Sequence, residues 1–284
     1  MIISVLGKGG SGKSSVTTQL VFALSDKRRS VLAIDADHNM DLCYNLTQGL
    51  EVEVPYFGSA MSEILNITGY GSDRDHPDVF LGGTDTRFSF RAEATDPFTK
   101  KYAVDLNDAV RLMVSGPQTD EVMYGKKCSH VLSAPLKIYL PLLEYADDQA
   151  VVVDEKAGAD GVTTGIVTGV DVAVIVVEPA WHSLKTAGHL AELCRFYGTP
   201  YLFVGNKIKS DDDRSYILSA LSSEDRGGKI EMLTHSDLLQ RDPAQPEESW
   251  ALELDRLIDQ TAGLVKGDRL ERTLAKYRRN VNYK

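Results

Sequence analysis

The sequence predicts an α/β fold in which a mostly parallel sheet is covered by helices on both faces. Short runs that are apolar throughout alternate along the chain with longer stretches of helical periodicity, a pattern typical of strands buried on both faces. A glycine-rich loop separates the first apolar run from the first helical stretch. Polar residues follow directly after several later runs, and in a parallel sheet those positions gather at one edge.

The elements follow from these patterns in order along the chain. Strands are expected at residues 2–6, 30–34, 110–114, 149–153, 172–177, 201–204 and 230–233. The run at 172–177 is too short and too rich in β-branched residues for a helix. Helices are expected at 16–24, 59–67, 132–145, 181–197, 247–261 and 268–281, and Pro135 is acceptable because it lies in a first turn. We expect residues 1–284 to form a single domain with an irregular insertion at about 50–109.

Composition excludes several classes of protein. The chain has 284 residues, of which 43% are hydrophobic and 25% charged, which is ordinary for a domain with its own core. Its net charge of −10 argues against a nucleic-acid partner. The cysteines, Cys43, Cys128 and Cys194, are odd in number and far apart, so we expect no disulfide framework and a cytoplasmic location.

Membrane association is not expected either. No apolar run approaches the length of a spanning helix, and the first strand begins too early to leave room for a signal peptide. The basic stretch at 270–284 carries few bulky apolar residues. That composition favours a solvated helix packed on the domain over one that lies in a membrane surface.

Residues 7–15 read G-K-G-G-S-G-K-S-S and match the phosphate-loop pattern G-x-x-x-x-G-K-[ST] between a strand and a helix. Glycines let backbone N–H groups approach an anion, and the following helix adds the positive end of its dipole. Lys13 is placed to reach the β- and γ-phosphates, and Ser14 offers its hydroxyl to Mg²⁺. The expected nucleotide-binding residues are Gly9, Gly10, Ser11, Gly12, Lys13, Ser14 and Ser15.

Polar residues at the ends of later strands predict the rest of this site. Asp35 and Asp37 follow one predicted strand, and Asp154 follows another. Magnesium–nucleotide chemistry needs carboxylates beside the phosphate loop, which hold the metal and orient water. Asn206 and Lys207 follow a further strand, and an asparagine amide can both donate to and accept from an adenine edge.

The phosphate cradle itself does not need the second lysine, Lys8. The form G-K-G-G-x-G-K-[ST] resembles the deviant Walker A loop of dimeric ATPases. These include the septum-site and plasmid-partition ATPases, the nitrogenase iron protein and the carbon monoxide dehydrogenase nickel-insertion ATPases. The resemblance implies a P-loop NTPase fold and a homodimer in which Lys8 reaches the nucleotide of the other subunit.

Other motifs extend the resemblance over nearly the whole chain. Residues 154–158 resemble the second switch, D-x-x-A-G, which implies that Asp154 supports Mg²⁺. Residues 35–41 resemble the first switch, with His38 in place of the usual proline; Asp37 matches the position that orients water near Mg²⁺. Asn206 and Lys207 resemble the base-contacting element. Lys209 stands where guanine-binding proteins carry aspartate, which favours adenine.

Two residues bear on the branch of this family. Cys128 falls where the nickel-insertion ATPases place a C-x-C pair, with His130 replacing the second cysteine. Two Cys-x-His pairs on a dimer axis would give an S₂N₂ set suited to Zn²⁺ or, with planar geometry, to Ni²⁺. A buried free cysteine beside a surface histidine is the alternative. Gly161 stands where the iron protein has its second cluster cysteine, which disfavours an electron-transfer ATPase.

Together these features predict an ATP hydrolase that binds ATP or ADP with Mg²⁺ and dimerises, with Lys8, Lys13 and Asp37 as catalytic residues. The resemblance implies a metal-centre maturation factor that delivers nickel to a client metalloenzyme, with Cys128 and His130 as metal ligands. The alternative is a regulatory or positioning ATPase that binds a protein partner without metal. A small-molecule ligase or kinase would need a substrate pocket that the sequence does not identify.

Overall fold

The computed structural model describes residues 1–27, 29–50, 53, 55–68, 88–118, 120–124, 132–159, 162, 165–222 and 229–281. Within these residues, an eight-stranded sheet has the order β10-β9-β8-β1-β7-β2-β5-β4. Its neighbours are parallel except at one edge, where β4 runs antiparallel to β5. The predicted mostly parallel sheet is therefore confirmed.

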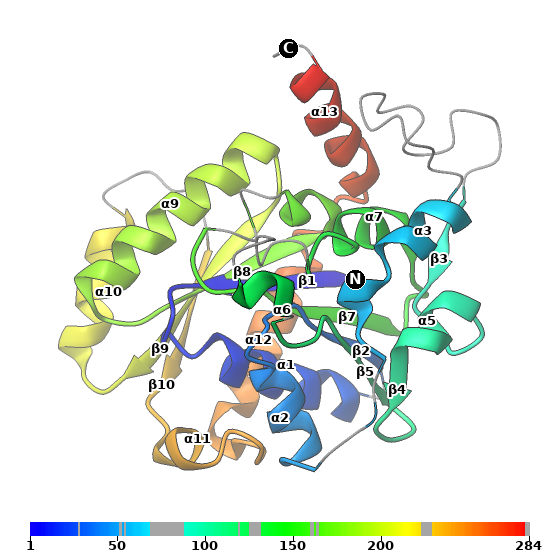
Figure 1. The fold of residues 1–284 in the computed structure, drawn as a ribbon. Coiled ribbons are helices and arrows are strands. Elements are labelled where there is room, and N and C mark those ends of the chain that lie inside the picture. The colour runs from blue at the N-terminus through cyan, green and yellow to red at the C-terminus, as the bar shows by residue number, and fades with distance from the viewer. Residues whose placement is uncertain are drawn as a thin grey trace.

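Figure 1 shows the arrangement of the helices and strands. The strands are β1 (Ile2–Gly7), β2 (Ser30–Asp35), β3 (Phe90–Arg91), β4 (Ala103–Asp105), β5 (Val110–Val114), β6 (Leu143–Glu144), β7 (Gln149–Asp154), β8 (Val172–Val177), β9 (Tyr201–Ile208) and β10 (Lys229–Thr234). The α-helices are α1 (Lys13–Asp26), α2 (Asp41–Thr47), α3 (Met61–Ile67), α5 (Pro97–Tyr102), α6 (Asp120–Met123), α7 (Leu136–Leu142), α9 (Trp181–Tyr197), α10 (Asp211–Ser222), α11 (Asp237–Arg241), α12 (Ala251–Ala262) and α13 (Arg269–Val281). Short 3₁₀ turns are η1 (Phe57–Ser59), η3 (Ile166–Gly169) and η4 (Glu248–Trp250).

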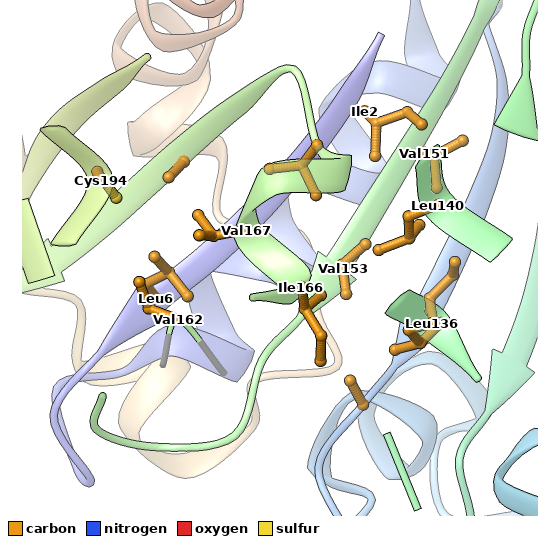
Figure 2. Packing of buried hydrophobic residues seen from close by; sticks show 14 of the residues in the cluster. Ile2, Leu6, Leu136, Leu140, Val151, Val153, Val162, Ile166, Val167 and Cys194 are labelled. Carbon is orange, nitrogen blue, oxygen red and sulfur yellow. The ribbon is translucent and has the colours of Figure 1, made fainter. Parts of the chain in front are cut away.

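Helices cover both faces of the sheet, and the strand pleat divides the core between them. On β1, Ile2 and Leu6 pack toward α7, α9 and η3, whereas Ile3 and Val5 pack toward α1 and α12. Figure 2 shows the first of these layers, in which Val153 of β7 lies among side chains of η3 and α7. Because the strands are apolar on both faces, little of the sheet can serve as a binding surface except its ends.

Some of the elements expected from the sequence differ from those in the structure. The helix expected at 132–145 is confined to α7, which contains Pro141, and the chain then extends as β6 to pair with β3. Strand β9 continues to Ile208, so Asn206 and Lys207 lie within the strand rather than after it. The short helices α2, α5, α6 and α11 and the 12-residue α10 were not predicted.

The described parts of residues 50–109 include η1, α3, β3, α5 and β4. An aromatic cluster joins this segment to α7: the ring of Phe57 meets those of Phe98, Tyr102 and Tyr139 edge-on, at centroid distances of 5.8, 5.8 and 5.4 Å. The Tyr139 hydroxyl also forms a 2.7 Å hydrogen bond with Thr99 Oγ1. These contacts hold the segment against the face of the sheet that bears α7.

Both ends of the described chain are tied to one buried carboxylate, Asp171. Asp171 Oδ2 accepts hydrogen bonds from the Ile2 N–H (2.7 Å) and the Tyr145 hydroxyl (2.6 Å). Arg269, at the start of α13, places its Nε 3.3 Å from Asp171 Oδ1. Among the described residues, none of the helices has the length and apolar character needed to cross a membrane.

This arrangement predicts a large stability effect at Asp171. Asp171→Ala leaves the Ile2 N–H without its acceptor and removes the carboxylate partner of the mostly buried Arg269, whose guanidinium keeps only backbone carbonyl acceptors, so we expect a loss of about 3–5 kcal/mol in the free energy of unfolding. Urea denaturation measures it. The matched control is Asp255→Ala, which removes an exposed 2.9 Å ion pair with Lys27 and should cost less than about 1 kcal/mol. Equal losses in the two variants would contradict the anchoring role.

Candidate functional site

The loop between β1 and α1 has a backbone that only glycine accommodates at two positions. Gly12 has φ +90°, and a Cβ there would lie 2.3 Å from Asn206 Nδ2. A Cβ on Gly7 would lie 2.6 Å from the Val176 carbonyl oxygen of β8. Lys13, the first residue of α1, is only 6% exposed. The loop is thus packed directly against the ends of β8 and β9.

Asn206 and Lys207 hold the outer side of this loop. Asn206 Nδ2 donates to the Ser11 carbonyl (2.9 Å), and Lys207 Nζ donates to the Gly10 carbonyl (2.5 Å). Since C=O and the next N–H point oppositely in a trans peptide, fixing the Ser11 carbonyl outward turns the Gly12 N–H inward. Asn206 Oδ1 accepts from the Lys207 N–H (2.8 Å), so both ends of this amide are engaged within the chain. The sequence did not predict this role in shaping the loop.

Asp154 lies at the end of β7, beside the loop. It pairs in register with Asp35 of β2, and both side chains are fully buried. Asp154 Oδ1 accepts from the Thr17 hydroxyl of α1 (3.1 Å), and the Ser14 side chain lies beside this carboxylate. Asp154 Oδ2 is buried without a hydrogen-bond partner. A carboxylate oxygen left open beside the serine hydroxyl is the donor set that Mg²⁺ prefers, so these residues fit a magnesium ion.

Asp35 and Asp37 have different environments although they are two residues apart. Asp35 accepts the N–H groups of Asp37 (3.1 Å) and Cys43 (2.8 Å), which fixes the bend after β2. Asp37 is 7% exposed, and its Oδ1 accepts the Asn39 N–H and lies 3.3 Å from His38 Nδ1. Asp35 therefore fixes the bend after β2, whereas Asp37 is one of the charges close enough to influence the pKa of Asp154, which desolvation chiefly raises.

The second switch segment and Lys8 lie on the remaining side of the loop. The Gly158 N–H donates to the Gly7 carbonyl (2.9 Å), and a Cβ on Gly9 would lie 3.7 Å from the Ala157 methyl group. Residues 154–158 are thus in direct contact with the phosphate loop. Lys8 is partly exposed, and its Nζ donates to the Gly9 carbonyl (3.2 Å).

A pocket of about 460 Å³ opens beside the loop. One end contains the predicted phosphate-binding residues, and the other is formed by the segment from β9 to η4. Its lining residues are Gly10, Gly12, Lys13, Ser14, Ser15, Asp41, Asn206, Lys207, Lys209, His235, Ser236, Leu239, Gln240, Pro243 and Trp250. The shape combines a polar, amide-rich end with a partly apolar end, as a nucleotide requires.

Gln19 of α1 joins the two ends of the pocket. Its Nε2 donates to the Gln245 carbonyl (2.8 Å) and lies 3.4 Å from the Pro243 carbonyl, while its Oε1 accepts the Glu247 N–H (2.8 Å). The indole of Trp250 is fixed by a 3.0 Å hydrogen bond to the Thr234 carbonyl. The helix that follows the phosphate loop therefore also positions the opposite wall.

The predicted transition-metal ligands, Cys128 and His130, lie outside the described residues. Within the part of the chain that the structure describes, no group of three or more His, Cys, Asp or Glu side chains is arranged to hold a metal ion. Of the other cysteines, Cys194 is buried in the core and Cys43 is half-buried on α2.

The sequence profile of the CobQ/CobB/MinD/ParA nucleotide-binding domain matches residues 2–282. The chain belongs to this family. It is 30% identical to the carbon monoxide dehydrogenase accessory protein CooC of Rhodospirillum rubrum over 231 residues, which cover 81% of this chain and 83% of CooC. It is 28% identical to an uncharacterized ATP-binding protein of Methanocaldococcus jannaschii, covering 79% of this chain and 85% of that protein.

Solved structures of MinD and ParA type share the fold. The septum site-determining protein MinD of Pyrococcus horikoshii, in complex with Mg-ADP, aligns with a TM-score of 0.60 at 19% identity, covering 92% of this chain and 97% of MinD. A variant of McdA from Cyanothece, in complex with ATP, aligns with a TM-score of 0.58 at 14% identity, covering 93% of this chain and 97% of McdA. The predicted deviant Walker A family and fold are confirmed.

Burial raises the pKa values of several acidic groups at this MinD/ParA-type site. Desolvation raises the pKa of Asp154 to about 6 and holds the pKa of Asp35 well above its usual range, where the neighbouring Asp154 charge raises it further. Desolvation also raises the pKa of Glu155 to about 8. Glu155 is 1% exposed, and its carboxylate is reached by the Ser4 hydroxyl at 3.4 Å. The sequence assigned no role to this buried acid.

The raised pKa of Glu155 predicts how stability depends on pH. Because the pKa of Glu155 is higher in the folded state than in the unfolded state, protonated Glu155 favours folding. This contribution to stability is fully present below about pH 4.5 and is lost as the pH rises through about 8. Glu155→Gln removes this loss. Without Mg²⁺, we expect the variant to gain more than about 1 kcal/mol of unfolding free energy over the wild type between pH 5 and pH 9.

Urea denaturation at the two pH values measures this difference. Glu248→Gln, at an exposed position on η4, is the matched control and should follow the wild type. A wild-type protein that matches Glu155→Gln at pH 9 would show that Glu155 is not held in its protonated form.

The Gln19 contacts predict a selective defect in ligand binding. Gln19→Leu breaks the link to residues 243–247 but leaves the phosphate loop in place, so we expect weaker binding of ATP and unchanged binding of inorganic triphosphate. Loss of one hydrogen bond of this kind corresponds to roughly 2- to 10-fold in affinity. Isothermal titration with both ligands measures it, with Lys13→Ala as the variant that should lose both. Equal losses for ATP and triphosphate after Gln19→Leu would refute the selective role.

Proposed function

We propose that this chain is a Mg²⁺-dependent ATPase that dimerises around bound nucleotide and uses the cycle to deliver a metal ion to a client metalloenzyme. The observation that carries the ATPase part is the open Asp154 carboxylate oxygen. It lies buried beside Ser14, and Ser14 lines a pocket that otherwise fits a nucleotide.

Each residue of the site has a role in this reaction. Lys13 and the loop N–H groups hold the phosphates, and Ser14, Asp154 and Asp37 hold Mg²⁺. Bound Mg²⁺ neutralises charge on the β- and γ-phosphates. Asp37 orients the attacking water, whose oxygen bonds to the γ-phosphorus as the bond to the bridging oxygen breaks, giving ADP and phosphate.

The opposite end of the pocket takes the base, and we propose adenine. Leu239 and Pro243 supply apolar surface for a planar ring, and Asn206 lines the same space. Lys209 occupies the position where an acidic residue would be needed to read the guanine amino group. Asn206 would have to release one of its contacts within the chain to read the base directly.

Dimerisation would complete the site. Lys8 lies on the loop with its ammonium on the Gly9 carbonyl, and in the proposed homodimer it reaches the partner's nucleotide. Residues 154–158 contact the loop through Gly158, so loss of the γ-phosphate would loosen this segment and open the dimer.

The similarity to CooC supports metal delivery, with Ni²⁺ or Zn²⁺ bound by Cys128 and His130 of both subunits. The alternative is a regulatory or positioning ATPase that binds a protein partner without metal. The MinD and ParA fold supports this second function to a similar extent.

One experiment separates the two functions. Purified protein is loaded with Ni²⁺ or Zn²⁺ under reducing conditions, and its metal content, oligomeric state and phosphate release are measured with and without MgATP. We expect MgATP-dependent dimers that hydrolyse ATP and retain one metal per dimer. Cys128→Ala should lose the metal and keep ATP binding, whereas Lys13→Ala should lose hydrolysis and nucleotide-dependent dimerisation.

The other outcomes are equally informative. Dimerisation and hydrolysis with no retained metal would replace metal delivery by the regulatory function. Absence of ATP hydrolysis in the metal-loaded wild type, with and without reductant, would overturn the ATPase proposal itself.

A further inference from the structure

An ion pair behind the phosphate loop connects β8 and β9 to the loop backbone. Lys207 Nζ lies 2.9 Å from Glu178 Oε2 and donates to the Gly10 carbonyl at 2.5 Å. Glu178 follows β8 directly, and β8 lies between β1 and β9 in the sheet. The three residues therefore come from three adjacent strand ends, and none of the motifs of the nucleotide site contains Glu178.

Glu178 is the more buried partner of this pair, and its backbone is tied to the start of α9. The Glu178 N–H donates to the Ser183 hydroxyl in the first turn of α9 (3.1 Å), and the Glu178 side chain is 20% exposed. The Lys207 side chain is more open, at 42% exposed, and its backbone has φ +61°, which is rare for a residue with a Cβ.

The pair has a consequence for the loop. A lysine ammonium on a four-carbon stem can reach many acceptors, and an anionic nucleotide nearby would compete for it. Glu178 counters that competition because its carboxylate, 2.9 Å from Lys207 Nζ, holds the ammonium beside the Gly10 carbonyl. The Gly10 carbonyl then keeps its outward direction at φ +82°.

We propose that Glu178 is a positioning residue for nucleotide binding, which keeps the Lys207 ammonium on the Gly10 carbonyl and so fixes the phosphate loop before nucleotide arrives. This inference rests on the proposed nucleotide-binding function. It also implies that the effect of Glu178 on nucleotide affinity changes sign with Lys207. Glu178 favours binding when Lys207 is present. When Lys207 is absent, Glu178 is an uncompensated negative charge and opposes binding.

A double-mutant cycle tests this dependence. The Kd for MgATP is measured by fluorescence with a labelled ATP analogue for the wild type, Glu178→Gln, Lys207→Met and the double variant. We expect Glu178→Gln to raise the Kd about fivefold in the wild-type background. In the Lys207→Met background the same change should lower the Kd, because it removes an unpaired carboxylate close to the phosphates. If Glu178 acted only on folding, Glu178→Gln would change the Kd in the same direction in both backgrounds.

Glu192→Gln, an exposed position on α9, is the matched control and should leave the Kd unchanged. If Glu178→Gln does not fold, Glu178→Ala gives the same comparison with the same expected reversal. If Glu178→Gln weakened MgATP binding equally in both backgrounds, or in neither, the positioning role would be overturned, although MgATP binding by the wild type would still stand. A wild type that fails to bind MgATP would instead overturn the proposed function, and this inference with it.

Discussion

Two carboxylates, Asp35 and Asp154, lie buried side by side in register on β2 and β7, and the rest of the site depends on their burial. Desolvation disfavours the charged form of each carboxylate and raises both pKa values, and the neighbouring Asp154 charge raises the pKa of Asp35 further. The structure treats the two differently. Asp35 is saturated by backbone N–H groups, whereas Asp154 keeps one oxygen open. The remaining negative charge is thus concentrated at the point where a cation can reduce it.

The phosphate loop is held by contacts from opposite sides. Gly158 of the second switch segment bonds to the Gly7 carbonyl, and the β9 residues Asn206 and Lys207 bond to the Ser11 and Gly10 carbonyls. One contact comes from a loop and the other from a strand inside the sheet. In the proposed cycle the strand would be the fixed support, and the loop would be the support that responds to the bound nucleotide.

Local patterns predicted the strands and the phosphate loop, because glycine spacing and apolar runs are properties of a few adjacent residues. The roles of Gln19 and Glu178 could not be predicted in this way. Each acts on residues far along the chain, at 243–247 for Gln19 and at Lys207 for Glu178. Seen in the sequence alone, Gln19 is an ordinary residue within a helix.

The misplaced boundaries have a similar cause. Helices of four to seven residues, such as α2 and α11, do not complete enough turns to show periodicity. Residues 143 and 144 continue a helical pattern but extend to pair with β3, a contact that depends on a segment 50 residues earlier. The polar residues Asn206 and Lys207 resemble the end of a strand in the sequence. They can nevertheless lie within β9, because their side chains form hydrogen bonds with the phosphate loop.

The position of β1 in the sheet has a consequence for the biosynthesis of the protein. Strand β1 is made before its partners, since Ile3 pairs with Val152 and Val172. Until Val152 is made, the nascent chain therefore carries an apolar strand with two unpaired edges, a state that chaperones bind and that otherwise aggregates. The phosphate loop gains its β9 contacts only after Lys207 is made, so its final support comes from a segment that is translated long after the loop itself.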